Sequence, residues 1–137
     1  RDMTIQLSVT VRNARLDAIE TTVGTSAILK IRSGSVPANC AAADSGTVLA
    51  TVSCPSDWLA AASSGSKSKS GTWEDTSADA TGTAAHFRLY ASDGTTCHMQ
   101  GTVTATGGGG DMTVDNTSFA SGQPFTVTGF TLTDGNA

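Results

Sequence analysis

The feature that most constrains the fold of this chain is a change in hydrophobic periodicity at Gly24. Before it, apolar residues recur at helical spacing, with Leu16, Ile19 and Val23 at positions i, i+3 and i+7. Ser8 is a typical N-cap residue, and Gly24 stands where helices commonly end in a left-handed residue. After Gly24, apolar and polar residues alternate in short runs, which is typical of β-strands. The sequence therefore predicts one helix, with Val11, Ala14 and Ala18 widening its apolar stripe, followed by a β domain.

Strands are expected where alternating runs are bounded by Gly, Pro, Asp or Ser. The clearest pair is Ala84–Tyr90 and Thr96–Thr106, because Asp93-Gly94 between them favours a turn with positive φ. We expect a short helical turn in WLAAA, which begins at Trp58, and a loop or weak strand at Ser63–Gly71. The other strands are expected at 27–32, 47–53, 72–75, 111–116 and 124–133.

The composition favours closely packed sheets. More than half of the 137 residues are Thr, Ser, Ala or Gly, whereas charged residues make up 15% and aromatic residues 5%. The predicted fold class is mainly β: an antiparallel β-sandwich, jelly-roll-like, of about eight strands with one N-terminal amphipathic helix. Residues 1–24 would form an arm and the helix, and residues 25–137 the β-sandwich, within a single structural domain.

Charge and hydropathy argue against two classes of partner. The formal net charge is −4, and no basic stripe interleaved with aromatic residues is present, so no nucleic-acid partner is predicted. The apolar runs are only a few residues long, so no membrane partner is predicted either. Arg1-Asp2-Met3 leads into mixed sequence, which predicts no signal peptide in this chain.

Three cysteines, Cys40, Cys54 and Cys97, leave at least one thiol unpaired, and no C-x-x-C motif is present. We expect them to be small buried hydrophobic residues of a protein made in a reducing cytoplasm. The alternative is one disulfide that joins Cys40 to Cys54 or to Cys97.

Four consecutive glycines, Gly107–Gly110, stand between two alternating runs. A phosphate-binding loop would need a following Lys-Ser or Lys-Thr, whereas Asp111 follows here and would repel a phosphate. No helix is expected to start there. The glycine run is therefore predicted to be the turn of a β-hairpin.

Other candidate catalytic groups are weak. Ser64 and Ser66 each stand three residues before a lysine, but the S-x-x-K motif of acyl-transferases needs a helix that this Gly-punctured stretch does not favour. His86 and His98 lie on the two strands of the predicted hairpin and would face one another only across it. Adjacent strand residues point to opposite faces, so Cys97 and His98 form no dyad. We expect both histidines to face solvent or an interface.

Ligand sites are weak as well. Asp111, Asp115 and Asn116 offer oxygen ligands but lack the calcium-loop pattern. Three large rings could form a sugar-stacking platform, although packing in the core is the default expectation for them in a chain with few large side chains. They are Trp58, Trp73 and Tyr90. No catalytic residue, cofactor or metal site is predicted, and the chain is not expected to be an enzyme.

The stretches TIQLSVTVRNARLDAIETTVG, FRLYASDGTT and FTVTGFTLTDGNA resemble a family of small virion-associated proteins of tailed bacteriophages. The resemblance covers the chain from about Thr4 to Ala137. It implies a capsid cement or decoration protein, or a tail accessory protein, β-rich and often trimeric. It also implies a location in the virion, after assembly in the cytoplasm of the host bacterium.

The predicted function is capsid decoration, in which the protein stabilises the shell by bridging capsid subunits. The expected partners are the major capsid protein, or another virion protein, and further copies of this chain, with a trimer favoured. The helix packs either on its own sheet or on a neighbouring subunit. The alternatives are a tail or fibre-tip protein that binds host glycans, a filament or tube subunit, and a small hydrolase built around one of the histidines. The candidate interface residues are Ile5, Leu7, Val11, Arg12, Arg15, Leu16 and Ile19, in or beside an arm at Met3–Leu7.

Overall fold

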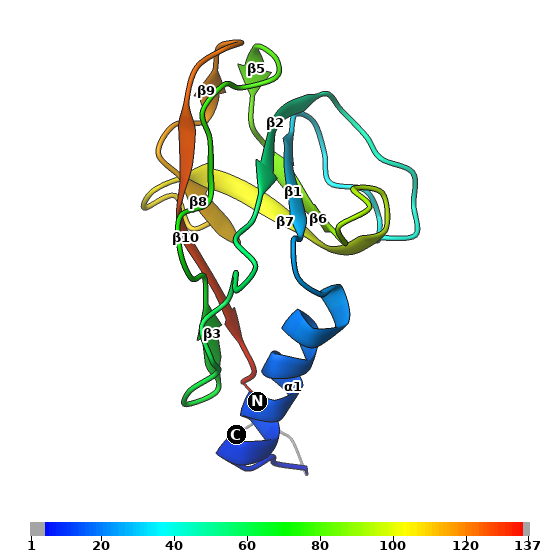
Figure 1. The fold of residues 1–137 in the computed structure, drawn as a ribbon, viewed down its shortest axis with the longest axis vertical. Helices are drawn as coiled ribbons and strands as arrows, with labels where there is room; N and C mark the ends of the chain where they lie inside the picture. Colours follow the sequence, from blue (N-terminus) through cyan, green and yellow to red (C-terminus); the bar gives the residue numbers. More distant parts are fainter. Residues whose placement is uncertain (1–4, 136–137) are drawn as a thin grey trace.

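The computed structural model describes residues 5–135 (Figure 1). In these residues one helix, α1 (Val9–Val23), precedes ten strands, several of them only two residues long. The strands are β1 (Ile28–Arg32), β2 (Val48–Ser53), β3 (Ser66–Ser68), β4 (Glu74–Asp75), β5 (Gly82–Thr83), β6 (His86–Tyr90), β7 (Cys97–Ala105), β8 (Met112–Val114), β9 (Ser118–Phe119) and β10 (Phe125–Thr133). The mainly β fold with one N-terminal helix is confirmed, and its main sheet has eight strands within residues 5–135, but this sheet is mixed rather than antiparallel, because β7 and β8 run parallel.

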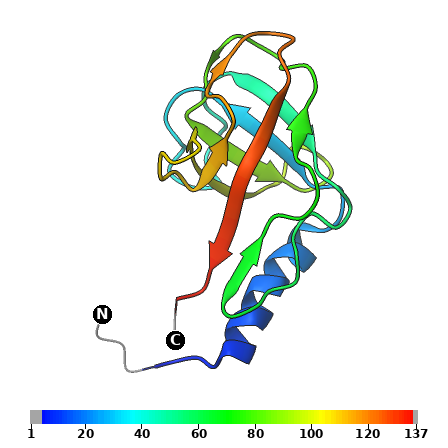
Figure 2. The same ribbon diagram turned by 90° about the vertical axis from the view of Figure 1, so that its left-hand side faces the viewer.

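Most of the strands belong to one curled sheet. Its order is β2-β1-β6-β7-β8-β10-β3, and β4 joins it by pairing with β10. The curl brings β4 against β2, where the N–H of Thr51 donates a hydrogen bond to Asp75 Oδ2 at 3.0 Å. Strands β5 and β9 form a small second sheet. Figure 2 shows the resulting shape, a β body below which α1, β3 and the last part of β10 lie together.

Helix α1 begins and ends where the sequence predicts. Ser8 adopts an extended conformation, and its hydroxyl accepts a hydrogen bond from the N–H of Val11 at 3.3 Å. Gly24 ends the helix with φ +88°, and its N–H donates to the carbonyl of Glu20 at 2.9 Å. Both caps are local, which is why the sequence alone could place them.

The buried stripe of α1 is narrower than the sequence suggests. Only Leu16 and Val23 are buried, while Val11, Ala14 and Ala18 are exposed. The helix is therefore only partly covered by its own chain. The end of α1 is joined to the core by Trp58, whose indole N–H donates to the carbonyl of Gly24 at 3.0 Å.

Strands β6 and β7 form the predicted hairpin. They pair antiparallel, and Gly94 in the connection has φ +70°. Asp93 fixes this turn because one of its carboxylate oxygens accepts the N–H groups of Thr95 and Thr96, each at 2.8 Å. The hydroxyl of Thr96, which also donates to the Asp93 carboxylate, and these two N–H groups lower the pKa of Asp93 to about 2.

The hairpin expected at Gly107–Gly110 is wrong, because β7 and β8 run parallel, with Val103 beside Met112. The chain instead loops back tightly around Thr104, whose hydroxyl accepts the N–H of Gly110 at 3.0 Å. A Cβ atom at Gly110 would lie 2.8 Å from the Thr104 side chain, so the loop needs glycine there. Alternation reveals a strand but not its direction.

The core lies inside the curled sheet, and its aromatic rings form a chain of contacts. The ring centroids of Trp58 and Trp73 are 6.0 Å apart, those of Trp73 and Phe130 are 5.6 Å apart, and Phe87 meets Phe130 edge-on at 5.6 Å. Trp58, Trp73 and Tyr90 are fully buried, at 0% exposure. Core packing is confirmed for Trp58 and Trp73, whereas Tyr90 is buried outside the core cluster, and none of the three rings forms an exposed sugar-binding platform.

The segment between β2 and β4 contains a hairpin rather than the expected helical turn. The WLAAA sequence is extended, and Leu59 pairs antiparallel with Lys69. Ser64 and Gly65 form the turn, with φ +52° and +75°. The helical turn at Trp58 is therefore wrong, because pairing with β3 satisfies the backbone instead.

Strand β6 is buried on both faces, although its sequence alternates. Phe87 and Leu89 point into the core. His86, Arg88 and Tyr90 point to the outer face, where the loop at residues 33–46 covers them. We call this segment the 33–46 loop.

Candidate functional site

Two regions are candidates for a functional site. Around α1, charged side chains lie beside exposed apolar ones, and beneath the 33–46 loop, charged side chains are buried. The first contains all the predicted interface residues. The second contains most of the buried charged groups of the sheet.

The predicted apolar interface residues differ in exposure. Ile5 is 68% exposed and Val11 is 44% exposed, whereas Leu7 and Ile19 are half-buried. Leu16 is buried within the chain itself, so it offers no surface to a partner. Of the Met3–Leu7 arm, Met3 and Thr4 lie outside the described residues.

The two predicted interface arginines contact the chain's own C-terminal segment. An Nη1–H of Arg12 donates to the carbonyl of Asp134 at 3.2 Å. Nε of Arg15 lies 3.2 Å from the Asp134 carboxylate, and the Arg15 side chain is 56% exposed. Arg12 therefore has an intramolecular role, while Arg15 keeps much of its surface available.

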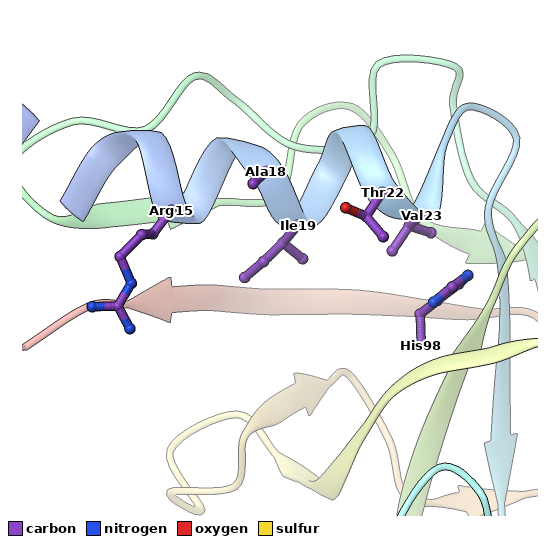
Figure 3. Close-up of a pocket in the computed structure, with 6 residues that line it drawn as sticks. All are labelled: Arg15, Ala18, Ile19, Thr22, Val23 and His98. Atoms are coloured by element: carbon purple, nitrogen blue, oxygen red, sulfur yellow. The ribbon is translucent and has the colours of Figure 1, made fainter. Parts of the chain in front are cut away.

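A groove lies along the side of α1 that is turned toward β10 and His98. It has a volume of about 250 Å³. Figure 3 shows Ile19 and Val23 pointing from the helix toward β10, with His98 of β7 opposite Thr22 and Val23. Arg15 lines the end of the groove nearer the start of the helix. The groove is thus apolar along its middle, with a cationic side chain at one end.

A second hollow, of about 460 Å³, lies next to it along β7. Met99, Gln100 and Asp111 line one part, and Leu132 of β10 lines another. In the described residues, pairing between β10 and β8 ends at Phe130 opposite Met112, so the last residues of β10 pair only with β3 on their other side. This end of β10 presents a strand edge beside the hollow.

The inner side of α1 is attached through one buried cation. The ammonium of Lys67 on β3 lies 2.6 Å from Asp17 Oδ1 and 2.9 Å from Glu20 Oε2, and it donates to the carbonyl of Ala60 at 2.9 Å. Its side chain is 2% exposed. We call Asp17, Glu20 and Lys67 the helix-anchoring cluster.

Electrostatics favour the charged form of this cluster. Burial alone would lower the pKa of Lys67, but its hydrogen bonds with Asp17 and Glu20 outweigh burial and raise that pKa above its ordinary value. The same contact with Lys67 lowers the pKa of Asp17. Because Lys67 lies in the strand after a tight turn, the S-x-x-K spacing with Ser64 is not helical and forms no catalytic pair.

Beneath the 33–46 loop, the guanidinium of Arg88 has four acceptors. Its Nη1 lies 2.6 Å from Asp44 Oδ1, and its Nη2 donates to the carbonyls of Asn39 at 2.8 Å and Ala42 at 3.0 Å. Its Nε donates to Gln100 Oε1 at 3.1 Å. Arg88 is 2% exposed, so its guanidinium reaches these loop acceptors from beneath the loop.

Asp44 joins two strands from the loop side. Its carboxylate accepts the hydroxyl of Tyr90 at 2.7 Å and an Nη2–H of Arg32 at 3.0 Å. Burial would raise the pKa of Asp44, but hydrogen bonds from Tyr90 and Arg88 hold it below its ordinary value. Burial, together with Asp44, raises the pKa of Tyr90.

His86 completes this group. Its Nδ1 lies 2.8 Å from the carbonyl of Gly34, and among the described residues its buried Nε2 has no partner. Burial lowers the pKa of His86, and the nearby charges of Arg32 and Arg88 lower it further. We call these residues the loop-anchoring cluster: Arg32, Asp44, His86, Arg88, Tyr90 and Gln100.

The expectation that both histidines face solvent or an interface is wrong for His86, which is fully buried, because the 33–46 loop covers the outer face of β6. His98 is exposed and lines the α1 groove. The β6–β7 register places Thr102 opposite His86, four residues from His98. The structure therefore does not bring the two histidines together across the hairpin.

The acidic residues near the glycine run have separate local roles. Asp111 accepts the N–H and the hydroxyl of Thr102, and Asp115 accepts the N–H of Thr126. Asn116 accepts the N–H of Ser118. Within residues 5–135, no group of three His, Cys, Asp or Glu side chains is placed to hold a metal ion.

The cysteines divide into two kinds. Cys54 is buried, as expected, and burial raises its pKa to about 12. Cys40 and Cys97 are only half-buried, so the expectation of buried thiols is wrong for them. Their sulfur atoms lie 2.7 Å apart, because the 33–46 loop folds onto the start of β7.

Sequence reasoning missed the roles of Asp44, Lys67 and Arg88. One signal was available, since Arg88 is a single long cation in an alternating strand of a chain with few charges. Arg88 lies 44 residues from Asp44 in the sequence, and Lys67 lies 50 residues from Asp17, so no local pattern links either pair.

A comparison with protein-family models, curated proteins and solved structures finds no match for this chain. The resemblance to tailed-phage proteins therefore rests on the sequence motifs alone. Among the described residues, no helix has the length and apolar character needed to cross a bilayer.

Proposed function

We propose that this protein is a structural protein of a bacteriophage particle, a capsid decoration protein that bridges subunits of the major capsid protein. The resemblance of its motifs to virion-associated proteins supports the location in the virion, after assembly in the host cytoplasm. The observation that carries the mode of action is the α1 groove, where Ile19 lies half-buried on a helix anchored to its own chain from the other side.

The surroundings of this groove suit binding to another protein. Ile5, Val9 and Val11 are 68%, 44% and 44% exposed, and all three lie in or just before α1. Contiguous exposed apolar surface marks protein interaction sites. Val9 and Val11 are two residues apart in the helix and point to different sides of it, so a partner at the groove would cover one of them. A partner that covers Ile5 and Val11 and inserts a side chain beside Ile19 would remove this apolar surface from water.

We further propose that copies of the chain associate as a trimer around the shell's symmetry axes. A closed trimer needs a heterologous interface, in which one patch of each subunit meets a different patch of the next subunit. The exposed guanidinium of Arg15, at the end of the α1 groove, would meet an acidic group of the neighbour or of the capsid protein.

No specific observation favours the glycan-binding alternative. A fibre-tip protein of that kind would expose aromatic rings for stacking on sugars, and Trp58, Trp73 and Tyr90 are buried here. The filament alternative uses the same apolar surface in an open rather than a closed arrangement, so it is decided by the experiment below.

The test is to mix the purified protein with expanded phage capsids and to image them by electron cryomicroscopy. We expect ordered density on the outer surface of the shell, with α1 at the contact. Absence of such density, or density on the tail alone, would overturn the decoration proposal, and open helical arrays would support the filament alternative.

A pair of variants makes the test specific to the α1 groove. Ile19→Asp places a charge in the groove and should abolish binding, whereas Ala14→Asp places the same charge at an exposed position of α1 that does not line it. Equal binding by the two variants would show that the groove is not the contact.

A further inference from the structure

Two thiols far apart in the sequence meet at the edge of the loop-anchoring cluster. Cys40 lies in the 33–46 loop and Cys97 begins β7, 57 residues later. Their Sγ atoms are 2.7 Å apart, and both thiols are free in the structure. Each residue is half-buried, so small solutes can reach this edge of the loop.

A β-bulge places Cys97 on the side of the loop. The β6–β7 register pairs Leu89 with Met99 and Tyr90 with Cys97, which leaves His98 as an extra residue. Met99 packs against the core, and strict alternation would direct Cys97 to that same side. Because of the extra residue, Cys97 instead lies on the outer face of the sheet, the face to which Tyr90 points.

The loop-anchoring cluster fixes Cys40 from both sides. The guanidinium of Arg88 binds the carbonyls of Asn39 and Ala42, and the side-chain amide of Gln100 donates to the carbonyl of Pro37 at 2.6 Å. Because the loop is already ordered, joining the two sulfur atoms requires little further loss of conformational entropy. A thiol pair ordered in this way has a high effective concentration.

We propose that Cys40 and Cys97 are a redox pair that forms an intrachain disulfide by exchange with a small disulfide such as glutathione disulfide, and that the bond fastens the 33–46 loop to β7. This inference goes beyond the proposed function and does not rest on it. It assigns a covalent modification site to a loop that is otherwise attached only by hydrogen bonds and ion pairs.

The exchange balances in two steps. One cysteine thiolate attacks a sulfur of glutathione disulfide, whose S–S bond breaks to release one glutathione thiolate and leave a mixed disulfide on the protein. The second cysteine thiolate attacks the protein sulfur of the mixed disulfide, forms the Cys40–Cys97 bond and releases the second glutathione. Each cysteine loses one hydrogen, and two electrons reduce glutathione disulfide to two glutathione thiols.

The thiol acidities set the pH dependence. Burial and the hydrogen bond with Cys40 raise the pKa of Cys97 to about 11, so only a small fraction of it is thiolate near neutral pH. Exchange should therefore become faster as the pH rises. Cys54 is the matched internal control, because it is buried and its pKa is raised to about 12.

The experiment uses the Cys54→Ala variant, which retains the proposed pair. Reduced protein is equilibrated with excess glutathione disulfide, denatured, alkylated with iodoacetamide and weighed intact by mass spectrometry. We expect no alkyl label after oxidation, two labels after treatment with dithiothreitol, and a monomer on a non-reducing gel. The oxidised form should melt about 10 °C higher than the reduced form.

Three results would overturn the proposal: two labels after oxidation, a lasting glutathione adduct, or a disulfide-linked dimer. Wild-type protein should show one label after oxidation, on Cys54. Replacing Cys40 by Ser in the Cys54→Ala background should leave a single thiol that retains glutathione. If that variant does not fold, the label count on Cys54→Ala alone decides.

Discussion

The 33–46 loop and helix α1 are both attached to the sheet by a buried cation, yet the attachments differ in strength. Arg88 has four acceptors spread over the loop and the neighbouring strand, and β6 carries it directly on the back of the core. Lys67 has three acceptors and lies on β3, a three-residue strand at the end of the sheet. The loop is therefore part of the folded body, whereas the helix is an appended element.

Burial supports the same distinction. Only Leu16 and Val23 of α1 are buried, so apolar packing adds little to its attachment. An element held mainly by polar contacts can open locally at a lower free energy than the core. A helix of this kind suits a surface that must adjust to a partner, which is the use proposed for the α1 groove.

The largest effect is expected for Arg88→Met. Removing the guanidinium takes the Arg88 donor from the carbonyl of Ala42, one of two donors from the carbonyl of Asn39, and one partner from Asp44, and should lower the free energy of unfolding by about 3 kcal/mol. Urea unfolding followed by the fluorescence of the buried tryptophans measures this. Lys69→Met is the control, since Lys69 is a half-buried cation just after β3 that donates to the carbonyl of Gly71. Equal losses of unfolding free energy in the two variants would contradict a special role for Arg88 in holding the 33–46 loop.

A smaller effect is expected for Lys67→Met. Asp17 and Glu20 have side-chain exposures of 48% and 22%, so water can replace much of what they lose. The free energy of unfolding should fall by about 1–2 kcal/mol, with helical circular dichroism lost before tryptophan fluorescence changes. Lys69→Met removes a cation that contacts only the carbonyl of Gly71 and should change little. Coincident loss of both signals in Lys67→Met would contradict separate attachment of α1.

Acidification from pH 7.5 to pH 5.5 should weaken only the loop-anchoring cluster. His86 has a lowered pKa in the folded protein, so the unfolded chain binds its proton first as the pH falls through about 6.5, and stability decreases. The slope is at most about 1.4 kcal/mol per pH unit for one proton. The pKa of Lys67 is raised in the folded protein, so the contribution of Lys67 to stability is lost only when the pH rises above the ordinary, alkaline pKa of lysine. In His86→Gln, the free energy of unfolding measured by urea titration should depend less on pH between 7.5 and 5.5. An unchanged slope would show that His86 is not the group responsible for the pH dependence.

The smallest effect on stability, about 1 kcal/mol, is expected for Ile19→Asp, because Ile19 is only half-buried. The same variant should lose the association that the α1 groove is proposed to support. Sedimentation or light scattering of wild type and variant, with Ala14→Asp beside them, gives the comparison. A large drop in the melting temperature of Ile19→Asp would mean that the groove belongs to the core of the chain.

Local signals carried the successful sequence predictions. Ser8 and Gly24 cap α1, and Asp93-Gly94 turns β6 into β7, because each signal acts over a few residues. The parallel pairing of β7 with β8 escaped prediction, since alternation is the same in either direction. Tight winding around Thr104 explains the glycine run, and no pattern in the sequence names that residue.

Long-range contacts account for the rest. Arg88 alternates with Phe87 and Leu89 as an outward-facing strand residue does, and only the return of the 33–46 loop buries it. For the same reason, Arg12 and Arg15 were expected to face a partner, although the C-terminal segment returns to meet them. Apolar periodicity marked α1 correctly but overstated its buried stripe, because the sheet beneath it is narrow there.

Hydrogen exchange measured by mass spectrometry on Lys67→Met and Arg88→Met, side by side, tests the central distinction most directly. The contrast between an integral loop and an appended helix predicts that Lys67→Met loses protection in residues 9–23 and 60–68 and keeps it in β1, β6 and β7. It predicts that Arg88→Met loses protection throughout those three strands. Uniform loss of protection in Lys67→Met, or unchanged protection of β6 in Arg88→Met, would contradict it.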